Sequence, residues 1–221
     1  MSSPPNEAWL AGQIPSAAGM EASLAAPRTL EGDKAQRIIA AMRASVGQRG
    51  AAASTFDHVA REAGVSRGLL HYYFGSKEQL LIEVVRHDCE VRIQAMDERI
   101  ARAGTVDEIV EALVASLQEF VEGEPGSQAV IYEMLSASRR SDDIRAELAE
   151  LYRRWRSHLA ESLRAKEREG VVRLQGDPDS VASMLFALGD GFGIQVVSDP
   201  DWDHDAAFGL GILIARRLLS A

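Results

Sequence analysis

Side chains that can bind DNA crowd a single stretch of the chain, residues 54–81, which reads STFDHVAREAGVSRGLLHYYFGSKEQLL. Arg67 can hold the O6 and N7 atoms of guanine with two hydrogen bonds, and Lys77 adds a second cation nearby. Thr55 and Ser66 carry hydroxyls at expected helix N-termini, where backbone amides point outward and bind phosphate. This combination is typical of a surface that reads a DNA duplex.

Two short helices must position these side chains. Ser54 and Asp57 match the S-x-x-D capping box, so the first helix is expected to begin near residue 55. Gly64 supplies the left-handed residue that ends it. The apolar side of this helix recurs at helical spacing and consists of Phe56, Val59, Ala60 and Ala63. Ser66 then caps a second helix after a short turn.

The second helix divides its residues between core and surface. Leu70 and Phe74 lie four residues apart and are expected to point inward, which leaves Arg67, His71 and Tyr72 facing out. Any small helical bundle needs caps, a glycine stop and an apolar stripe, so no single residue here is decisive. Their order and spacing together predict a helix-turn-helix.

This stretch closely resembles the signature of the TetR family of bacterial transcription regulators, roughly T-x-x-x-I-A-x-x-A-G-V-S-x-G-x-L-Y-x-Y-F-x-S-K-E-x-L. The matching residues follow in register without a gap: Thr55, Val59-Ala60, Ala63-Gly64-Val65-Ser66, Gly68, Leu70, Tyr73-Phe74, Ser76-Lys77-Glu78 and Leu80. His71 replaces the family's common tyrosine, and Leu69 replaces a small or hydroxyl residue. These departures are expected to change which bases or phosphates are touched, since His71 can donate to a phosphate and Leu69 can pack on a thymine methyl.

The resemblance assigns roles to several of these residues. Thr55 resembles the family's phosphate anchor, while Tyr73 and Lys77 match positions that clamp the DNA backbone. Ser66 can donate to a phosphate as well as cap its helix, and Gly68 lets the backbone come close. The residues predicted to bind DNA are therefore Thr55, Ser66, Arg67, Gly68, Leu69, His71, Tyr72, Tyr73 and Lys77.

The charge distribution fits a DNA-binding module on an acidic body. The whole chain carries a formal net charge of -9, which disfavours general binding to nucleic acid. Between Asp33 and His87, eight Lys and Arg residues oppose five Asp and Glu residues, so this part carries +3 and the remainder -12. Such a module can dock alone, while the acidic body suppresses nonspecific binding to phosphate.

Length and composition favour a two-part cytoplasmic protein. The 221 residues, 46% of them hydrophobic, suffice for a sizeable core. The single cysteine, Cys89, cannot form an internal disulfide and is expected to be a partly buried thiol in a reducing compartment. No run of about 18 apolar residues is present, so no membrane span is expected. Residues 1–32 lack the features of a secretory signal and are expected to form a flexible arm.

Helical patterns account for the remaining residues. A first helix bracing the two DNA-facing ones is expected to end at Gln48-Arg49-Gly50, and a long helix to run from Lys77 to about Arg102. The expected apolar positions of the long helix are Leu81, Val84, Val85, Val91, Ile93, Met96 and Ile100. From about residue 105 caps and breaks recur, with no convincing strand. The predicted fold is all-α, with a three-helix helix-turn-helix DNA-binding head at 33–80 and a helical-bundle ligand-binding and dimerisation domain at 81–221.

The resemblance further implies a homodimer and a small-molecule inducer. TetR-like proteins commonly pair their last long helices across a two-fold axis, and Gly189, Gly191 and Gly193 are compatible with close backbone approach. Members of the family usually hold an inducer in the body. Side chains suited to contact it, which equally suit a core or an interface, are Phe120, Tyr132, Met134, Trp155, Phe186, Asp190 and Gln195.

Enzymatic interpretations find little support. The chain has no phosphate loop, nucleophile elbow or HExxH pattern, and neighbours His87, Asp88 and Cys89 fan out around a helix without converging on a metal. No catalytic residue, metal site or cofactor is predicted. The predicted function is that of a repressor that binds a near-palindromic operator as a dimer and is released by an inducer. A transcription activator, a protein-interaction module with a degenerate head and a helical enzyme stay as alternatives.

Overall fold

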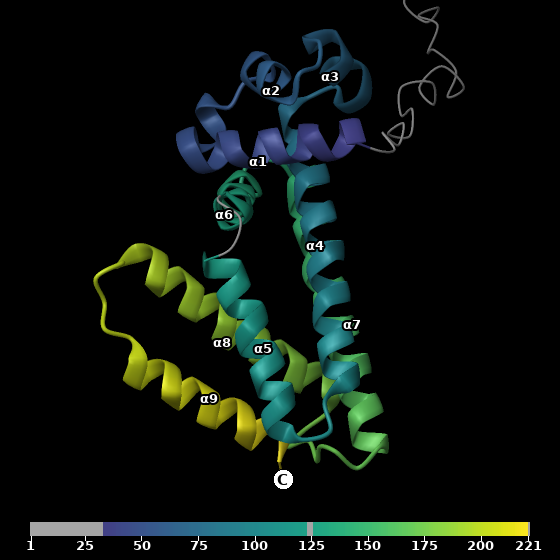
Figure 1. The fold of residues 1–221 in the computed structure, drawn as a ribbon, viewed down its shortest axis with the longest axis vertical. Helices are drawn as coiled ribbons and strands as arrows, with labels where there is room; N and C mark the ends of the chain where they lie inside the picture. The colour runs from purple at the N-terminus through teal and green to yellow at the C-terminus, as the bar shows by residue number, and fades with distance from the viewer. Residues whose placement is uncertain (1–32, 123–125, 221) are drawn as a thin grey trace, which may run out of the picture.

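The computed structural model describes residues 33–122 and 126–220 of the chain (Figure 1). Within these ranges the secondary structure is helical, apart from an isolated bridge between Arg173 and Ser220. The all-α fold class is therefore confirmed. The arm expected at residues 1–32 lies outside the described residues.

Three helices form the head at the top of Figure 1: α1 (Asp33–Ala53), α2 (Phe56–Ala63) and α3 (Arg67–Phe74). Gly50 breaks the helical path of α1, with φ of 73° and ψ of 163°, where the sequence predicted the end of the first helix. α1 lies beneath α2 and α3 and packs against α4 and α6, so it joins the head to the rest of the molecule.

Ser54 does not cap α2, contrary to the sequence prediction. The break at Gly50 turns Ser54 into the core, where its hydroxyl donates to the Gly50 carbonyl oxygen at 2.9 Å and lies 2.9 Å from the hydroxyl of Ser45. Thr55, the next hydroxyl in the chain, is the N-cap instead. Because Ser54 and Thr55 are neighbours and both carry hydroxyls, the sequence pattern could not show which of the two caps α2.

Six further helices complete the described part of the chain: α4 (Lys77–Arg102), α5 (Val106–Glu122), α6 (Ser127–Ala137), α7 (Asp142–Arg168), α8 (Pro178–Ser198) and α9 (Asp205–Leu219). α4 descends from the head with α7 packed along it, and α8 and α9 project away from this pair (Figure 1). The predicted division between residues 80 and 81 falls inside α4, which therefore belongs to both head and body.

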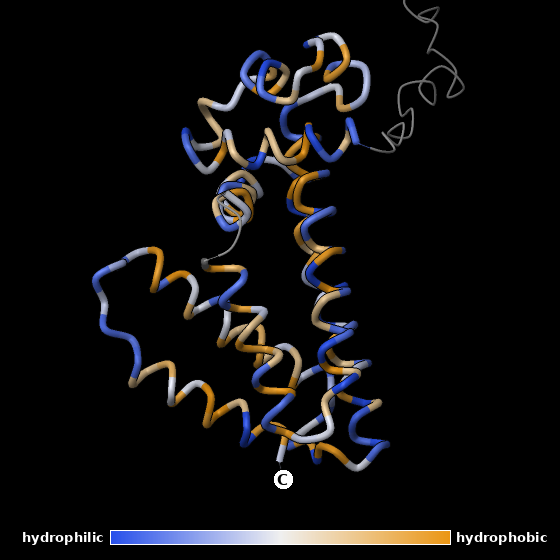
Figure 2. Tube along the Cα trace, viewed as in Figure 1, coloured by the Kyte–Doolittle hydropathy of each residue, from blue (hydrophilic) through white to orange (hydrophobic). Residues whose placement is uncertain are grey.

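Two hydrophobic clusters hold these helices together. The upper one joins the head to α4, α6 and α7, and the lower one joins α4, α5, α7, α8 and α9. Figure 2 shows apolar residues recurring along α4 and α7. Val91, expected among the apolar positions of α4, is exposed. It lies two residues from Cys89 and from Ile93, which are buried, and two residues turn a helix by about 200°, so Val91 faces the opposite side.

Several large apolar side chains of α8 remain exposed on the surface of the protomer. By length and composition alone this helix could cross a membrane, a possibility that the count of unbroken apolar residues did not indicate. Its Met184, Ile194 and Val197 side chains are each about half exposed. Core helices of soluble proteins can have the same length and composition, so this feature is weak evidence for a membrane span.

Candidate DNA-binding surface and ligand cavity

α2 and α3 meet at a turn that is fixed by caps and a glycine. The side-chain oxygens of Thr55 and Ser66 each accept a hydrogen bond from the backbone amide three residues ahead, at 3.4 Å and 3.2 Å. Gly64 adopts the left-handed conformation, with φ of 67° and ψ of 37°. Leu70 is fully buried and Phe74 packs against the same core. These features confirm the helix-turn-helix geometry that the sequence predicted.

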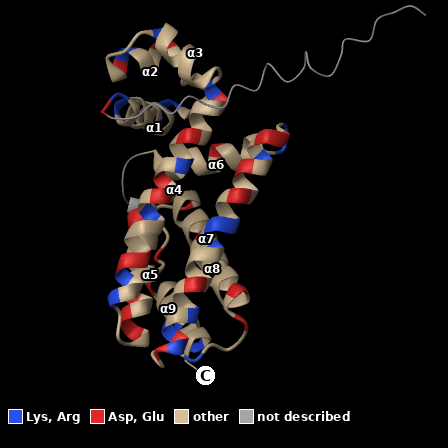
Figure 3. Cartoon of the chain, turned by 90° about the vertical axis from the view of Figure 1, so that its right-hand side faces the viewer, with Lys and Arg blue, Asp and Glu red and all other residues tan. Residues whose placement is uncertain are grey.

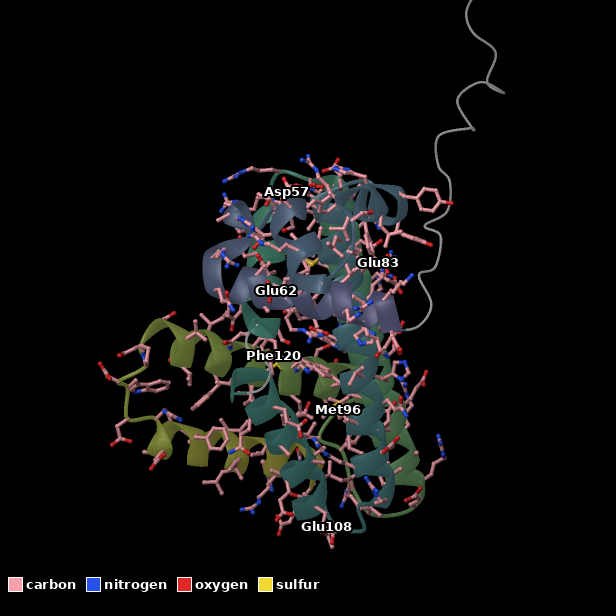
Figure 4. All side chains as sticks on the ribbon, turned by 45° about the horizontal axis from the view of Figure 1, so that its top comes forward. Asp57, Glu62, Glu83, Met96, Glu108 and Phe120 are labelled. Carbon is pink, nitrogen blue, oxygen red and sulfur yellow. The ribbon has the colours of Figure 1, made fainter. Side chains whose placement is uncertain are left out.

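Arg67 occupies the first turn of α3 and is the exposed cation at its start, with 59% of its side chain accessible. One guanidinium nitrogen donates to the Asp57 carboxylate at 3.1 Å, and Nε donates to Nε2 of His71 at 3.3 Å. Figure 4 places Asp57 on the upper surface of the head. Asp57 therefore ties α3 to α2 and sets the direction of the Arg67 guanidinium instead of closing a capping box.

Lys77 is partly engaged within the protein. Its Nζ donates to the carbonyl oxygen of Ala51 at 2.7 Å, which joins the start of α4 to the end of α1. An ammonium group has three donors, so two are left for other acceptors. Tyr72 is exposed and its ring contacts that of Tyr73 edge-on, with centroids 5.0 Å apart. A Cβ added at Gly68 would meet nothing closer than 4.0 Å, so α3 is open there.

The nine residues predicted to bind DNA thus share one region of the head. Those that are exposed are Thr55, Ser66, Arg67, Gly68, His71 and Tyr72, and those that are partly buried are Leu69, Tyr73 and Lys77. Figure 3 marks acidic residues along the body helices below the head, which agrees with the charge asymmetry in the sequence. Contact of these nine residues with DNA stays a prediction.

A cavity of about 490 Å³ opens in the body. Residues from α4, α5, α6, α7, α8 and α9 line it, and the lining is mainly aliphatic and aromatic. Phe120 and Met96, both in the wall, lie in the body below the head in Figure 4. Pockets for small organic molecules have volumes of about 300–1,000 Å³, so the cavity suits such a ligand.

Six of the seven residues predicted to contact a ligand line this cavity: Phe120, Tyr132, Trp155, Phe186, Asp190 and Gln195. Met134 does not, because it is buried in the upper cluster. It follows Tyr132 by two residues on α6, about 200° around the helix. The sequence prediction missed Arg92 and Tyr152, since nothing in the local pattern of α4 or α7 shows which face meets a cavity.

Two oppositely charged side chains line the cavity. The guanidinium carbon of Arg92 lies 4.3 Å from the ring centroid of Phe120 and 5.5 Å from that of Trp155. Burial lowers the pKa of Arg92, while nearby acidic groups oppose this shift. Burial raises the pKa of Asp190, and a hydrogen bond with Tyr152 opposes that shift. The cavity is therefore an apolar chamber with a cation and a hydrogen-bonded carboxyl in its wall.

The start of α6 connects the body to α1. Nε of Arg43 donates to the Asp88 carboxylate at 3.0 Å, and the Ser127 hydroxyl donates to the same carboxylate oxygen at 3.2 Å. Gly126 has φ of 101°, and a Cβ there would collide with the carbonyl of Arg43. Helices α1, α4 and α6 are thus joined at one point between head and body.

The head matches the family described as "Bacterial regulatory proteins, tetR family" over residues 38–84, and the body matches "BetI-type transcriptional repressor, C-terminal" over residues 102–217. The chain belongs to the TetR family. It is a helix-turn-helix transcription regulator with a body of the BetI-type repressor kind. TetR-family regulators bind DNA, act as dimers and bind small molecules.

Individual relatives of this TetR-family chain agree with that assignment. HTH-type transcriptional regulator BetI of Agrobacterium fabrum is 31% identical over 185 residues, spanning 74% of this chain and 88% of the relative. BetI of Rhizobium meliloti is 37% identical over 131 residues, or 58% of this chain and 63% of the relative. A transcriptional regulator from Saccharomonospora viridis, solved in complex with choline, superposes with a TM-score of 0.63 and 26% identity, covering 83% of this chain and 91% of that one.

Proposed function

We propose that this TetR-family regulator is a cytoplasmic repressor, without enzymatic activity, that binds a near-palindromic operator as a homodimer. It releases the operator when a small molecule fills the body cavity. The observation that carries the DNA-binding part is the capped α2–α3 turn, which holds the exposed Arg67 on a braced three-helix head. In this proposal residues 33–80 form the DNA-binding head and residues 81–221 the ligand-binding and dimerisation domain, with α4 shared between them.

The head would dock with α3 in the major groove. Arg67 reads guanine, since its guanidinium can donate two parallel hydrogen bonds to O6 and N7. The hydroxyls and backbone amides at Thr55 and Ser66 bind phosphates, because both residues cap helix N-termini. Tyr73 and the remaining donors of Lys77 clamp the backbone on the far side of α3. Gly68, Leu69, His71 and Tyr72 complete the contact surface.

The α8 and α9 faces would form the dimer interface. Large apolar side chains are exposed there on both helices, including Met184 at 52%, Leu210 at 58% and Leu213 at 57%. A Cβ added at Gly191, Gly209 or Gly211 would meet nothing within 4 Å in one protomer, which leaves room for a partner helix. Gly193 differs, because its Cβ position lies 3.4 Å from the Tyr132 hydroxyl of the same protomer. Symmetric pairing of these faces would bury the apolar surface and set two heads side by side.

α6 is the element that would carry the ligand signal. Ile131 and Tyr132 line the cavity, and the next residue, Glu133, accepts a hydrogen bond from the backbone amide of Ala51 at 3.4 Å. A ligand that displaces α6 therefore also displaces the end of α1 in the head. Ligand binding can shift the separation of the two heads only if the ligand has different affinities for the two arrangements.

Selection from a random duplex library, with the full-length protein at near-physiological salt, tests this proposal. We expect enrichment of a near-palindrome that binds with a dissociation constant of roughly 10⁻⁸ M or tighter and with a steep dependence on salt. A folded, dimeric protein that enriches no sequence would favour a protein-interaction module with a degenerate head. Placing the enriched sequence upstream or downstream of a promoter then separates repression from activation.

A further inference from the structure

Arg92 is a cation in the cavity wall that has no acidic partner within residues 33–122 and 126–220. Its Nε is buried and has no hydrogen-bond partner among the described residues. Over the same part of the chain, Arg92 forms no ion pair with a carboxylate. Its guanidinium is instead placed over the rings of Phe120 and Trp155. A guanidinium keeps its proton in proteins, so this group is a charge with unused donors.

The acids that influence Arg92 most already have donors of their own. Asp88 accepts hydrogen bonds from Arg43 and Ser127. Asp190 is hydrogen-bonded by Tyr152. A partly buried cation whose buried Nε donor is unpaired destabilises the unliganded protein, and such groups cluster at functional sites. An external acceptor is therefore the missing partner of this guanidinium.

The rest of the cavity wall favours a ligand that is apolar apart from this acceptor group. The aliphatic side chains around the cavity include Leu113, Leu117, Ile131, Leu159 and Leu185. They remove apolar groups from water but offer no hydrogen bonds, so a ligand with polar groups along its whole length would be poorly served.

We propose that the cavity binds an organic acid with an apolar chain, whose carboxylate pairs with Arg92. The planar guanidinium fits a carboxylate with two parallel hydrogen bonds, which would pair its charge. This assignment deepens the proposed function and rests on it only for the ligand's role, since a carboxylate bound here would be the inducer.

The same geometry disfavours a quaternary ammonium at Phe120 and Trp155. Such cations bind over aromatic faces, but here the Arg92 guanidinium already lies 4.3 Å and 5.5 Å from the two ring centroids. A cationic ligand at these rings would meet a like charge in a mainly apolar cavity. On this point the chain is expected to differ from the Saccharomonospora viridis regulator that was solved with choline.

Three ligands with one tail and different head groups test the proposal: decanoate, 1-decanol and decyltrimethylammonium. Each is titrated calorimetrically into the full-length protein. Because a hydrogen bond to a charged group contributes about 1.5–3 kcal/mol, decanoate should bind about tenfold or more tighter than decanol, with the cation weakest. Arg92→Met should remove this preference while leaving decanol binding unchanged, and Arg92→Lys should keep part of it. Arg99→Met is the matched control, since it removes a cation from the same helix that is paired with Glu119.

Decanol or decyltrimethylammonium binding as tightly as decanoate would overturn the proposal, as would failure of decanoate to bind. If Arg92→Met does not fold, unchanged decanoate affinity in Arg92→Lys would overturn it equally. Operator release is measured separately on the enriched duplex. Decanoate that binds through Arg92 but leaves the operator complex intact would contradict the inducer role and leave the site assignment standing. Release by decyltrimethylammonium in both wild type and Arg92→Met would support the ligand-released regulator of the proposed function and overturn the assignment of a carboxylate to Arg92.

Discussion

Arg67→Ala is the substitution that separates DNA recognition from folding most cleanly. The Arg67–Asp57 pair is 3.1 Å long, and both side chains are more than half exposed. An exposed ion pair contributes about 0–1 kcal/mol to stability, and a cation at a helix N-terminus opposes the helix dipole by a similar amount. The free energy of unfolding should therefore change by less than about 1 kcal/mol.

Operator binding should respond far more strongly to the same change. A bidentate contact with guanine discriminates by about 1–3 kcal/mol, and a symmetric dimer loses two such contacts, or about 2–6 kcal/mol together. That loss corresponds to roughly 30-fold weaker binding or more. Because a base contact releases no phosphate counterions, the slope of log affinity against log salt should stay unchanged, whereas each lost phosphate contact would lower it by about 0.9.

Fluorescence anisotropy of the enriched duplex across a salt series measures both quantities. Arg153→Ala is the control, because Arg153 has the same 59% side-chain exposure, also pairs with an acid, and lies on α7 in the body. The control should bind like wild type. The assignment of Arg67 as a base reader would be refuted if Arg67→Ala bound the operator as tightly as wild type. It would also be refuted if Arg153→Ala lost as much affinity as Arg67→Ala.

Two substitutions and one labelling experiment probe the body and its connection to the head. Gly126→Ala should destabilise the protein by more than about 1 kcal/mol in urea unfolding, because the residue has φ of 101° and its Cβ would strike α1, whereas Gly176→Ala, with open space around it, should be nearly neutral. Burial raises the pKa of the Cys89 thiol to about 11, so roughly one thiol in a thousand is ionised at pH 8. Iodoacetamide should therefore label Cys89 much more slowly in the native protein than in the unfolded protein. Equal labelling rates would contradict the burial of Cys89. Burial also raises the pKa of Asp190, so the protonated carboxyl stabilises the fold below its unfolded-state pKa, and this stabilisation is lost as pH rises through the folded-state pKa. Asp190→Asn should therefore be more stable than wild type at neutral pH. A difference in melting temperature between the two proteins that does not shrink on acidification would contradict the raised pKa of Asp190.

The sequence predicts those parts of the fold that depend on local geometry. Gly64 ends α2 and Ser66 caps α3 because each acts within one turn of its own helix, and both are where the spacing predicted. Leu70 is buried for the same reason, since the period of the helix decides its face. The span of α4 from Lys77 to Arg102 follows from an uninterrupted pattern that ends before Gly104.

Features that depend on which helices meet are less predictable. Met134 was expected at the ligand because aromatic and Met residues are frequent on the body helices, but it is buried in the upper cluster together with residues of α1, α4 and α7. Arg92 reads in the sequence as one more surface cation of α4, and only the packing of α5 and α7 against that helix places it over two rings. Ser54 was predicted to cap α2, but beyond the break at Gly50 its side chain is buried and Thr55 caps the helix instead.

The central claim, a dimer that reads two major grooves from one face of the duplex, is tested most directly by half-site phasing. The enriched duplex is compared with versions that carry 5 or 10 additional base pairs between its half-sites. If two heads bind simultaneously, adding about half a helical turn should abolish tight binding, because the half-sites then face opposite sides of the duplex. Affinity unchanged by the 5-base-pair insertion would contradict the account, since each head would then be binding independently of the other.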